Sequence, residues 1–374
     1  MDNLPPVVIP PSEPERRSTN VFVRFWKWLR AKPYRLIVAI VLILVLIGGG
    51  VAAAIVLQPK SKVESSTKKV TKKAAPVEKV YYSPLTGIKV ADEAATRQPV
   101  TAIMIENSPD ARPHSGLRQA GVVYEAIAEG GITRFLAVYQ EAKPQLIGPV
   151  RSLRMYYLDW AAPYNASIAH IGGSAAALAE VRNGSYRDID QFFNASTYWR
   201  ASDRYAPHNV YTSFEKLDAL NAAKGYKEST FTGFTRGDGK PSQTPDATTV
   251  NIDFSSQLYN TQYTYDASSN TYKRSIGGGA SLDREEGQLA PNVIVALRVN
   301  MTHVMEDGYR ESIQTTGTGD ATVFQNGTAI PATWSKASRT AQLEILDTAG
   351  KPIALNRGQT WIAAVPATGA VRWQ

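Results

Sequence analysis

The residue types best suited to chemistry gather in four short stretches of the chain. The first is YEAIAEGGITRF at residues 124–135. It places Glu125 and Glu129 four residues apart, and Arg134 follows Glu129 by five residues. On a helix, two carboxylates at this spacing share one face, where they form either an acid/base pair or a solvated edge. Glu125 and Glu129 are therefore candidate catalytic residues, and Arg134 is a candidate ligand-binding residue.

The second stretch, IGPVRSLRMYYLDWA at residues 147–161, contains two arginines where acidic residues are expected. Its Gly-Pro pair predicts a helix that begins just after Pro149, with Arg151 and Arg154 in the first turn. The helix macrodipole makes that end partly positive, so cations there are mildly unfavourable. We interpret both arginines as ligand-binding side chains at a helix end that already attracts anions. In the alternative interpretation they form structural ion pairs with Glu125, Glu129 or Asp159.

The third stretch, HIGGSAAAL at residues 170–178, is typical of an apolar strand, a turn and the start of a helix. Ser174 is placed to cap that helix, where exposed N–H groups form a small anion cradle or simply an ordinary capped end. The spacing fits neither a Walker motif nor a dinucleotide fingerprint, so no cofactor is predicted. His170 is a candidate acid or base, and Ser174 is a candidate ligand-binding residue.

The fourth stretch, YWRASDRYAPHNVY at residues 198–211, is a predicted loop with many polar side chains. It carries Arg200, Arg204, His208 and Asn209. Loops with this density of polar groups often serve binding or catalysis. His208 joins the acid/base candidates, and the other three residues join the candidates for ligand binding.

The basic residues of the chain differ in type from one region to the next. Residues 111–205 contain nine arginines and one lysine, whereas the segment at 58–79 contains only lysine. Arginine presents a planar fork that matches carboxylate or phosphate, while lysine is a hydrated point charge. The arginines therefore indicate anion recognition in an arginine-rich cleft.

The net charge of +8 is not spread over the chain. Residues 1–79 hold 14 Lys and Arg against 5 Asp and Glu, a net of +9, which leaves a net of −1 for the remainder. A nucleic-acid-binding domain needs a basic surface of its own. We therefore predict no nucleic-acid partner for the folded part.

An uncharged run of 22 residues, 36–57, dominates the N-terminal region. At about 1.5 Å per residue it spans roughly 33 Å, enough to cross a bilayer as a helix. A cleaved signal peptide is the alternative, because small residues near position 52 resemble a cleavage site. We expect a cytoplasmic head at 1–35, a single-pass signal anchor, a Lys-rich tether at 58–79 and extracytoplasmic domains beyond it.

The chain has no cysteine and four histidines, none of them at metal-ligand spacing. Disulfides and thiolate metal sites are excluded, and no metal is predicted.

Beyond the tether, two composition patterns predict an α+β protein with two domains. From 80 to 240, strand-like runs at 100–107, 131–140 and 167–171 alternate with helical ones, which indicates a mixed α/β domain. A Gly/Pro/Thr-rich boundary at 235–248 precedes a smaller, mostly-β domain at 241–374. Its predicted strands include 249–254, 261–265, 292–299, 321–330 and 359–365, with Asn326-Gly327 as a type I′ hairpin turn.

Several motifs together resemble the YerB-like lipoprotein family, also called domain of unknown function 3048. They are SPLTG (83–87), RPHSGL (112–117), EGGITRF (129–135), IGPVRSLR (147–154), HIGGS (170–174) and APHNVY (206–211), followed by NVIV (292–295), GTGDATVF (317–324) and GQTWI (358–362). The resemblance covers nearly all of residues 81–374 and implies a bacterial surface protein held at the membrane. It brings no established activity and no catalytic residue. The chain departs from the lipoprotein pattern because it has no cysteine to acylate.

These observations favour a membrane-anchored, extracytoplasmic binding protein of the bacterial cell envelope. Its ligand is expected to be anionic, for example a cell-wall polymer held in the arginine-rich cleft. One alternative is an enzyme on envelope polymers that uses Glu125 or Glu129 with His170 or His208 as an acid/base pair. A further alternative is a scaffold for an envelope protein complex, with the β domain as its docking surface.

Overall fold

The computed structural model describes residues 79–303 and 311–374, which belong to one compact unit, Val77–Gln374. The predicted head, transmembrane helix and tether lie outside the described residues. Within the described part, no helix is long and apolar enough to cross a membrane.

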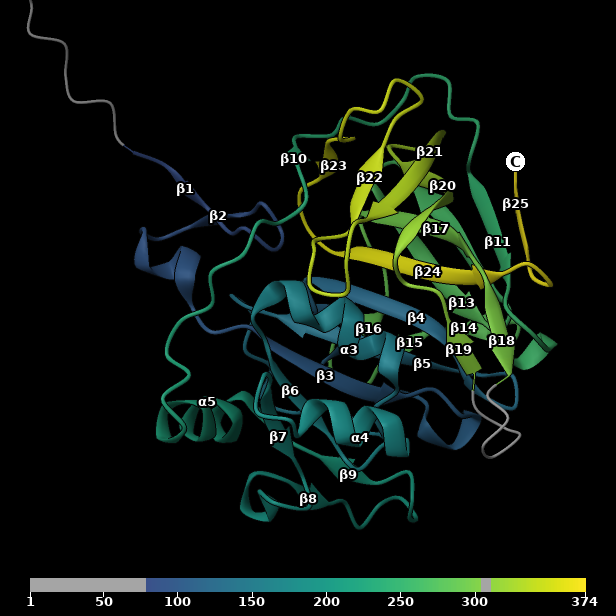
Figure 1. Cartoon of the computed structure of the whole chain (residues 1–374). Coiled ribbons are helices and arrows are strands. Elements are labelled where there is room, and N and C mark those ends of the chain that lie inside the picture. Colours follow the sequence, from purple (N-terminus) through teal and green to yellow (C-terminus); the bar gives the residue numbers. More distant parts are fainter. Residues whose placement is uncertain (1–78, 304–310) are drawn as a thin grey trace, which may run out of the picture. The chain divides into compact units, whose positions relative to one another are not determined.

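A ten-stranded mixed sheet forms the centre of this unit (Figure 1). Its order is β22-β21-β20-β17-β24-β4-β5-β3-β6-β7, and the pairs β17–β24, β24–β4, β3–β6 and β6–β7 are parallel. The bounds are β3 Thr101–Glu106, β4 Val122–Glu129, β5 Ile132–Tyr139, β6 Ser167–His170, β7 Arg187–Asp190, β17 Val293–Val299, β20 Gly317–Gln325, β21 Thr328–Lys336, β22 Glu344–Leu346 and β24 Thr360–Pro366. Strands β3 and β24 are buried along their whole length, which matches their nearly continuous apolar sequences.

A second, antiparallel sheet has the order β14-β13-β12-β11-β25. Buried and exposed residues alternate in β12, as expected for a strand with one wet face. The bounds are β11 Thr249–Asp253, β12 Thr261–Asp266, β13 Thr271–Ile276, β14 Gly279–Ala280 and β25 Ala370–Trp373.

The remaining elements are short. In the described residues, the helices are α3 Met155–Ala161, α4 Ala175–Val181 and α5 Phe214–Ala223. One-turn 3₁₀ helices are η1 Ala94–Arg97, η2 Pro109–Ala111, η3 Leu117–Gln119, η4 Ala162–Tyr164, η5 Ala195–Thr197 and η6 Gln257–Tyr259. Two-stranded pairs are β1 Tyr81–Tyr82 with β2 Lys89–Val90, β8 Trp199–Arg200 with β9 Val210–Tyr211, β10 Arg236–Gly237 with β23 Leu355–Asn356, β15 Leu282–Asp283 with β16 Gly287–Gln288, and β18 Met301–His303 with β19 Glu311–Ile313.

Two apolar layers cover the two faces of the large sheet. Successive residues of a strand point to opposite faces, so Phe135 and Leu136 of β5 belong to different core clusters. Leu136 shares its cluster with side chains of α3 and α4. Phe135 shares the other with side chains of α5 and of the five-stranded sheet. The predicted mixed α/β architecture is confirmed, with large sheets and few helices.

The predicted strands at 100–107, 131–140 and 167–171 are confirmed as β3, β5 and β6. The helix predicted for Glu125 and Glu129 is wrong, because both lie on strand β4. Gly130 and Gly131 have φ of 55° and 79°, the backbone of a tight hairpin turn that pairs β4 with β5. The Val, Tyr and Ile residues of this segment favour a strand over the helix on which the two carboxylates would share one face.

The helix predicted to begin after Pro149 begins instead at Met155. Residues 150–153 are held extended, because Arg151 N–H donates to Met104 O at 2.8 Å and Leu153 N–H donates to Gly172 O at 3.0 Å. Arg154 is the N-cap residue, in an extended conformation and without a side-chain cap. Arg151 therefore precedes the helix, whereas Arg154 remains at its positive end, where the carboxylate of Glu129 compensates its charge.

The large sheet crosses the boundary drawn at residue 240. Strand β24 lies between β17 and β4, and it pairs with β4 in parallel from Thr360↔Val122 to Ala363↔Glu125. Residues on both sides of the boundary belong to the same compact unit. The two halves of the chain thus share one core.

Candidate functional site

Polar residues end the three adjacent parallel strands β3, β6 and β7. They are Glu106, His170 and Asp190. Ligands of open α/β sheets commonly bind at the carboxyl ends of the strands. This edge is therefore a candidate ligand-binding edge of the sheet.

Glu106 forms the centre of a small cluster. Its Oε1 lies 2.9 Å from His208 Nδ1, 3.0 Å from Ser108 Oγ and 3.4 Å from Arg151 Nε. Glu106 is 4 % exposed, and its Oε2 has no hydrogen-bond partner. The side chains of Arg151 and His208 are 26 % and 23 % exposed. A ligand can therefore reach the cation and the imidazole that surround a buried carboxylate.

Ser108, His208 and Glu106 do not form a serine-hydrolase relay. Ser108 Oγ lies 3.2 Å from His208 Nδ1, the same ring nitrogen that contacts Glu106. A relay needs the serine and the carboxylate on opposite ring nitrogens. The cluster is suited to acid/base or binding roles rather than to a serine nucleophile.

Glu129 forms a second cluster with two buried arginines. Its Oε2 lies 2.5 Å from an Arg154 terminal nitrogen, and its Oε1 accepts a short hydrogen bond from Arg134. Burial raises the pKa of Glu129, but the charges of Arg134 and Arg154 outweigh burial and leave it below its ordinary value. Burial and the charge of Arg134 lower the pKa of Arg154, and Glu129 offsets only part of this.

The two clusters meet along residues 151–154. Arg134 donates to Ser152 O at 2.8 Å, and Arg134 and Glu106 are direct register partners of β5 and β3. We call the set Glu106, Glu129, Arg134, Arg151 and Arg154 the arginine–carboxylate site. It places three guanidinium groups beside two carboxylates, an excess of one positive charge.

The arginines of this site keep unused donors. The Nε atoms of Arg134, Arg151 and Arg154 are buried and have no hydrogen-bond acceptor of good geometry. The sequence brought these three residues forward as candidates, and the structure brings them together. Internal carboxylates pair with all three. For Arg151 and Arg154 this is the alternative interpretation, and of its three possible partners only Glu129 is found, with Arg154, whereas Arg151 pairs with Glu106.

His170 lies apart from these clusters and is fully buried. Its Nδ1 lies 2.7 Å from Gly172 O and its Nε2 lies 3.0 Å from Asp188 Oδ1. Asp190 Oδ1 accepts from Gly172 N–H at 3.2 Å. Both ring nitrogens are thus occupied in holding the turn after β6.

Ser174 acts as a helix cap. Its Oγ accepts from Ala177 N–H at 3.4 Å at the first turn of the seven-residue helix α4. The predicted cap is confirmed, and the hydroxyl serves the helix itself.

The remaining loop candidates hold the loop together. Arg200 donates to Asn209 Oδ1 at 2.8 Å, and Asn209 Nδ2 donates to Ala201 O at 3.0 Å. Arg204 donates to the carbonyl oxygens of Asp110 at 2.8 Å and Pro113 at 2.6 Å. These bonds fix the loop that carries His208 beside Glu106.

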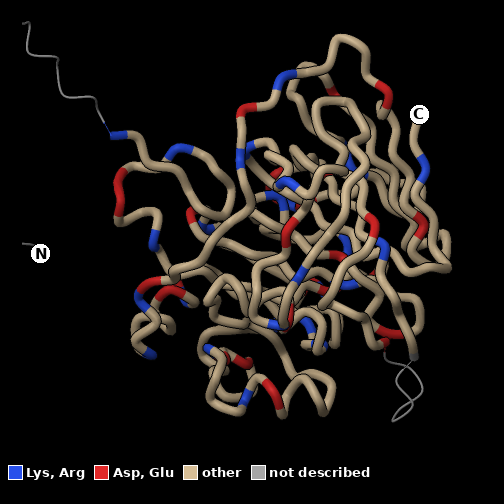
Figure 2. The backbone as a smooth tube through the Cα atoms, turned by 45° about the horizontal axis from the view of Figure 1, so that its top comes forward, with Lys and Arg blue, Asp and Glu red and all other residues tan. Residues whose placement is uncertain are grey.

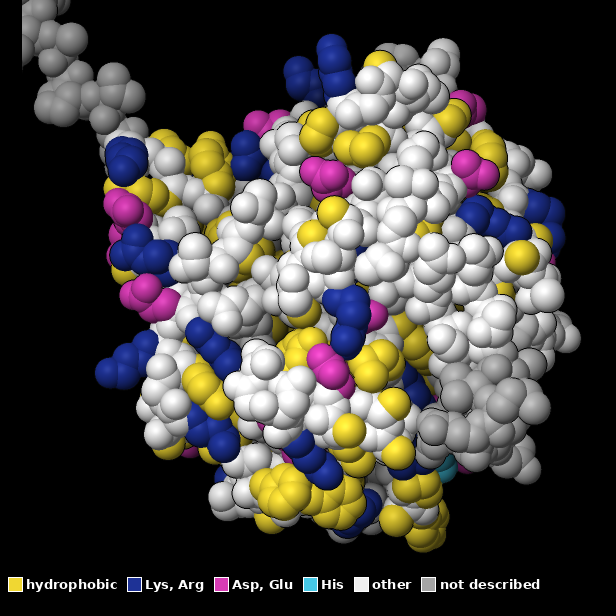
Figure 3. All heavy atoms as spheres, viewed as in Figure 1, with side chains coloured by type: hydrophobic (Ala, Val, Ile, Leu, Met, Phe, Trp, Pro, Cys, Tyr) yellow, Lys and Arg dark blue, Asp and Glu magenta, His cyan; other side chains and the backbone are white. Residues whose placement is uncertain are grey.

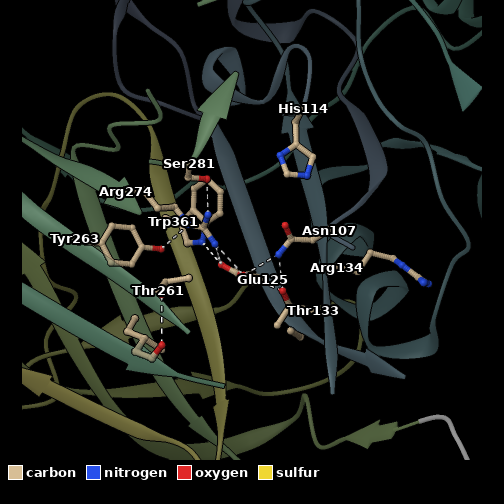
Figure 4. A network of polar contacts seen from close by, with 12 residues as sticks. Asn107, His114, Glu125, Thr133, Arg134, Thr261, Tyr263, Arg274, Ser281 and Trp361 are labelled. Atoms are coloured by element: carbon tan, nitrogen blue, oxygen red, sulfur yellow. Dashed lines mark hydrogen bonds and ion pairs between the residues drawn. The ribbon is translucent and has the colours of Figure 1, made fainter. Parts of the chain in front are cut away.

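Glu125 lies outside the carboxyl-edge clusters, in a buried polar network (Figure 4). Both Glu125 and Arg274 have side chains that are 0 % exposed, and Arg274 donates to the two carboxylate oxygens at 3.0 and 2.9 Å. Trp361 Nε1 adds a bond at 2.9 Å and Thr133 Oγ1 one at 3.0 Å. Glu125 is therefore a structural residue without access to solvent.

The sequence interpretation missed Glu106 and Arg274. Glu106 had a readable signal, because it is an acidic residue at the end of the apolar run TAIMIE. Arg274 had none, since its partner Glu125 lies 149 residues away in the chain. Within residues 79–303 and 311–374, no group of three His, Cys, Asp or Glu side chains could hold a metal ion.

Comparisons with known proteins agree with the motifs. Two family models match, "Protein of unknown function (DUF3048) N-terminal domain" over residues 85–227 and its C-terminal counterpart over residues 250–362. The chain is 33 % identical over 290 residues to the Bacillus subtilis (strain 168) protein named "Putative lipoprotein YerB", which covers 76 % of this chain and 86 % of that protein. It resembles the crystal structure of the YerB protein from Bacillus subtilis with a TM-score of 0.70 and 30 % identity, over 78 % of this chain and 99 % of that one. The chain therefore belongs to the YerB-like family that is defined by the DUF3048 N- and C-terminal domains.

Proposed function

We propose that this protein is an extracytoplasmic binding protein, anchored at the membrane of a bacterial cell. The apolar run at 36–57 and the Lys-rich tether at 58–79 support this location. The relative from Bacillus subtilis is named a lipoprotein, which is a membrane-attached class. In a chain without cysteine, the apolar helix would take the place of the lipid anchor.

The excess positive charge of the arginine–carboxylate site carries the proposed binding function. Three guanidinium groups share two carboxylates, and the buried Nε donors of Arg134 and Arg154 lack acceptors. A cation whose charge is incompletely compensated attracts an anion, and an anion bound at the exposed part of Arg151 would supply the missing negative charge. The lowered pKa of Arg154 points the same way, because it reports a cation that its surroundings do not fully compensate.

The surroundings of Glu106 narrow the chemistry of the proposed ligand. The Glu106 carboxylate is buried, so a ligand reaches the exposed part of His208 beside it, and this imidazole can hydrogen-bond to a hydroxyl group that an anion such as sulfate does not offer. A polymer with both hydroxyl and anionic groups fits His208 and Arg151 together. Anionic cell-wall polymers have this composition, so we propose them as the ligand class.

Arg151 provides the test, because it is the arginine of the site with the most exposed side chain, at 26 %. The full chain is mixed with purified cell-wall sacculi and with the same sacculi stripped of anionic polymer, and the bound fraction is measured by sedimentation. Arg151→Ala is expected to weaken binding to intact sacculi about 10-fold, the effect of one charge-assisted hydrogen bond. Arg151→Lys is expected to bind intact sacculi more weakly than the wild type but more tightly than Arg151→Ala, because lysine keeps the charge but lacks the planar fork of the guanidinium group.

Arg97→Ala is the matched control, since Arg97 is an exposed arginine of η1 that pairs with Glu93 and Glu228. It is expected to bind like the wild type. Equal binding by the wild type and Arg151→Ala would contradict the proposal, and so would equal binding to intact and stripped sacculi. Thermal unfolding of each variant checks that the fold is kept.

One observation favours a second function, an enzyme that acts on envelope polymers. Glu106 and His208 lie 2.9 Å apart, within reach for general acid/base catalysis, although Glu106 was not the expected glutamate. Release of soluble wall fragments by the wild type, lost in Glu106→Gln while sedimentation with sacculi persists, would establish the enzyme. Absence of any release by the wild type would exclude it.

A further inference from the structure

A pocket of about 350 Å³ lies beside the loop that carries His208. It is lined by Trp199, Arg200, Asp203, Tyr211 and Arg284, among others, and none of its residues belongs to the arginine–carboxylate site. Its size falls in the range of pockets that hold small molecules. The residue types are those that recognise a ring and an anion.

The aromatic wall comes from the two-stranded pair β8–β9. Trp199 and Tyr211 are direct register partners, so their side chains stand on the same side of this pair. Tyr211 is only 1 % exposed and forms the floor, while Trp199 is partly exposed and offers its ring to a ligand. The Tyr211 hydroxyl lies near Arg284 but makes no well-aligned hydrogen bond.

The cation that lines the pocket near the Tyr211 hydroxyl, Arg284, comes from the second half of the chain. Arg284 follows β15, and its backbone N–H donates to His114 O at 2.7 Å, which fixes the residue against the RPHSGL segment. Its guanidinium donates to Asp203 Oδ2 at 2.7 Å. This arginine therefore already pairs with a carboxylate inside the pocket.

The ion pair with Asp203 is open to exchange. Asp203 is 53 % exposed at its side chain and Arg284 is 31 % exposed. Ion pairs at such exposure contribute little, so a ligand carboxylate that docks against Trp199 can take the place of Asp203. Arg200, exposed at the rim, adds positive charge to the same opening.

The lining does not resemble a phosphate site. No glycine is among the residues that line the pocket, and no helix begins there, whereas phosphate is usually held by glycine-rich loops and helix N-termini. A planar guanidinium beside an accessible indole ring suits a ring that carries a carboxylate. We infer that this pocket binds an acidic sugar, a pyranose ring that stacks on Trp199 and pairs its carboxylate with Arg284.

Binding of a galacturonic acid trisaccharide to the purified full chain, measured by titration calorimetry, tests this inference. The neutral galactose trisaccharide is expected to bind at least 10-fold more weakly, because it lacks the carboxylate. Trp199→Ala and Arg284→Ala are each expected to weaken binding of the acidic sugar about 10-fold. Asp203→Asn is expected to strengthen it about 2- to 5-fold, because it removes the competing carboxylate.

Trp373→Ala and Arg372→Ala are matched controls on β25. Trp373 is 46 % exposed, and Arg372 pairs with Asp253 as Arg284 does with Asp203. Both controls are expected to bind the acidic sugar like the wild type.

Three outcomes would overturn the inference. The first is unchanged binding of the acidic sugar in Trp199→Ala and Arg284→Ala. The second is weaker binding in Asp203→Asn. The third is a glycerol phosphate polymer that displaces the bound sugar as effectively as the free acidic sugar does. Because the inference uses no residue of the arginine–carboxylate site, Arg151→Ala is expected to bind this sugar normally. Failure of the pocket and failure of the proposed function are thereby distinguished.

Discussion

At the scale of single residues, His114 shows how strongly the core acts on one ionisable group. The ring is 1 % exposed, packs edge-on against Phe135 with centroids 5.3 Å apart, and has its Nε2 2.8 Å from Glu106 O. Burial, with the charge of Arg274 as a second cause, lowers the pKa of His114 to about 3. The neutral ring must then donate its Nε2 proton to the carbonyl oxygen of Glu106.

This shift predicts a pH-dependent stability. The unfolded chain binds a proton at His114 below the ordinary pKa of 6.5, whereas the folded protein does so only near 3. Stability is therefore full above pH 6.5 and falls as the pH is lowered towards 3, by up to about 1.4 kcal/mol per pH unit. Between pH 7 and 5, the free energy of unfolding is expected to fall by about 2 kcal/mol more in the wild type than in His114→Gln.

Urea denaturation of both proteins at pH 7 and pH 5 measures this difference. The glutamine keeps a donor for Glu106 O but does not titrate. Glu129 does not interfere, because its pKa lies below its ordinary value of 4.5 and its contribution is lost only at lower pH. The same fall in stability in both proteins would show that His114 is not the titrating group.

The residue types in the sequence predicted the kind of interaction better than they predicted which side chains pair with each other. The abundance of arginine predicted recognition of an anionic ligand, and this stays a prediction. Arg134, Arg151 and Arg154 do meet at one place, where they pair with internal carboxylates. The sequence left Glu129 as one of three possible partners of Arg154 and did not suggest Arg274 as the partner of Glu125, because these contacts depend on the tertiary fold. Sequence spacing alone carries no information on such long-range pairs.

At the scale of elements, two hairpin turns set the register of the large sheet. Gly130 and Gly131 join β4 to β5, and Asn326 and Gly327 join β20 to β21. Asn326 and Gly327 have φ of 60° and 78°, as a type I′ turn requires, so this predicted turn is confirmed. Asn326 Oδ1 also accepts from Asn356 Nδ2 at 2.7 Å, which ties the turn to β23.

Gly327 is expected to tolerate alanine less well than a glycine in an open turn. Gly350 is the matched control, because its φ of 75° is similar and nothing lies within 4 Å of an added Cβ. At Gly327 an added Cβ would lie 2.6 Å from Tyr265 Cε1. Gly350→Ala is expected to cost about 1 kcal/mol for its backbone strain alone, and Gly327→Ala at least about 1 kcal/mol more. Equal losses in urea denaturation would contradict a packing role for this turn.

Local signals were most reliable where tertiary contacts agreed with them. The helix beginning after Ser174 and the hairpin at Asn326-Gly327 rest on local chemistry, and both are confirmed. The segment at 150–153 failed because its N–H groups bond to β3 and to the turn after β6 instead of to the start of a helix. A Gly-Pro signal cannot reveal that a distant strand will take up these backbone groups.

At the scale of the whole molecule, acidic and basic residues are dispersed over the fold. The two halves of the chain are also interlocked. Figure 2 shows acidic and basic residues interspersed along the folded trace, and Figure 3 shows no broad patch of one sign on the face in view. Recognition in both proposals is thus local, at single clusters of arginine. The interlock consists of β24 between β17 and β4, together with the buried pair of Glu125 on β4 and Arg274 on β13.

This interlock predicts that the two halves unfold together and that Arg274 stabilises both. Arg274→Met leaves the buried Glu125 carboxylate without its cation, which is expected to cost about 3–5 kcal/mol. Glu125→Gln with Arg274→Met removes both charges and is expected to recover part of that loss. Arg372→Met is the control at the exposed pair with Asp253 and is expected to cost less than about 1 kcal/mol.

Urea denaturation followed by both tryptophan fluorescence and far-ultraviolet circular dichroism measures these effects. Five of the seven tryptophans lie in the part of the chain that the structure describes, namely Trp160, Trp199, Trp334, Trp361 and Trp373. Coincidence of the two spectroscopic transitions is the criterion for joint unfolding. In Arg274→Met both transitions are expected to move to lower urea by the same amount. Because β24 cannot leave β4 without exposing the core of both halves, separate transitions for the two probes would contradict the shared core.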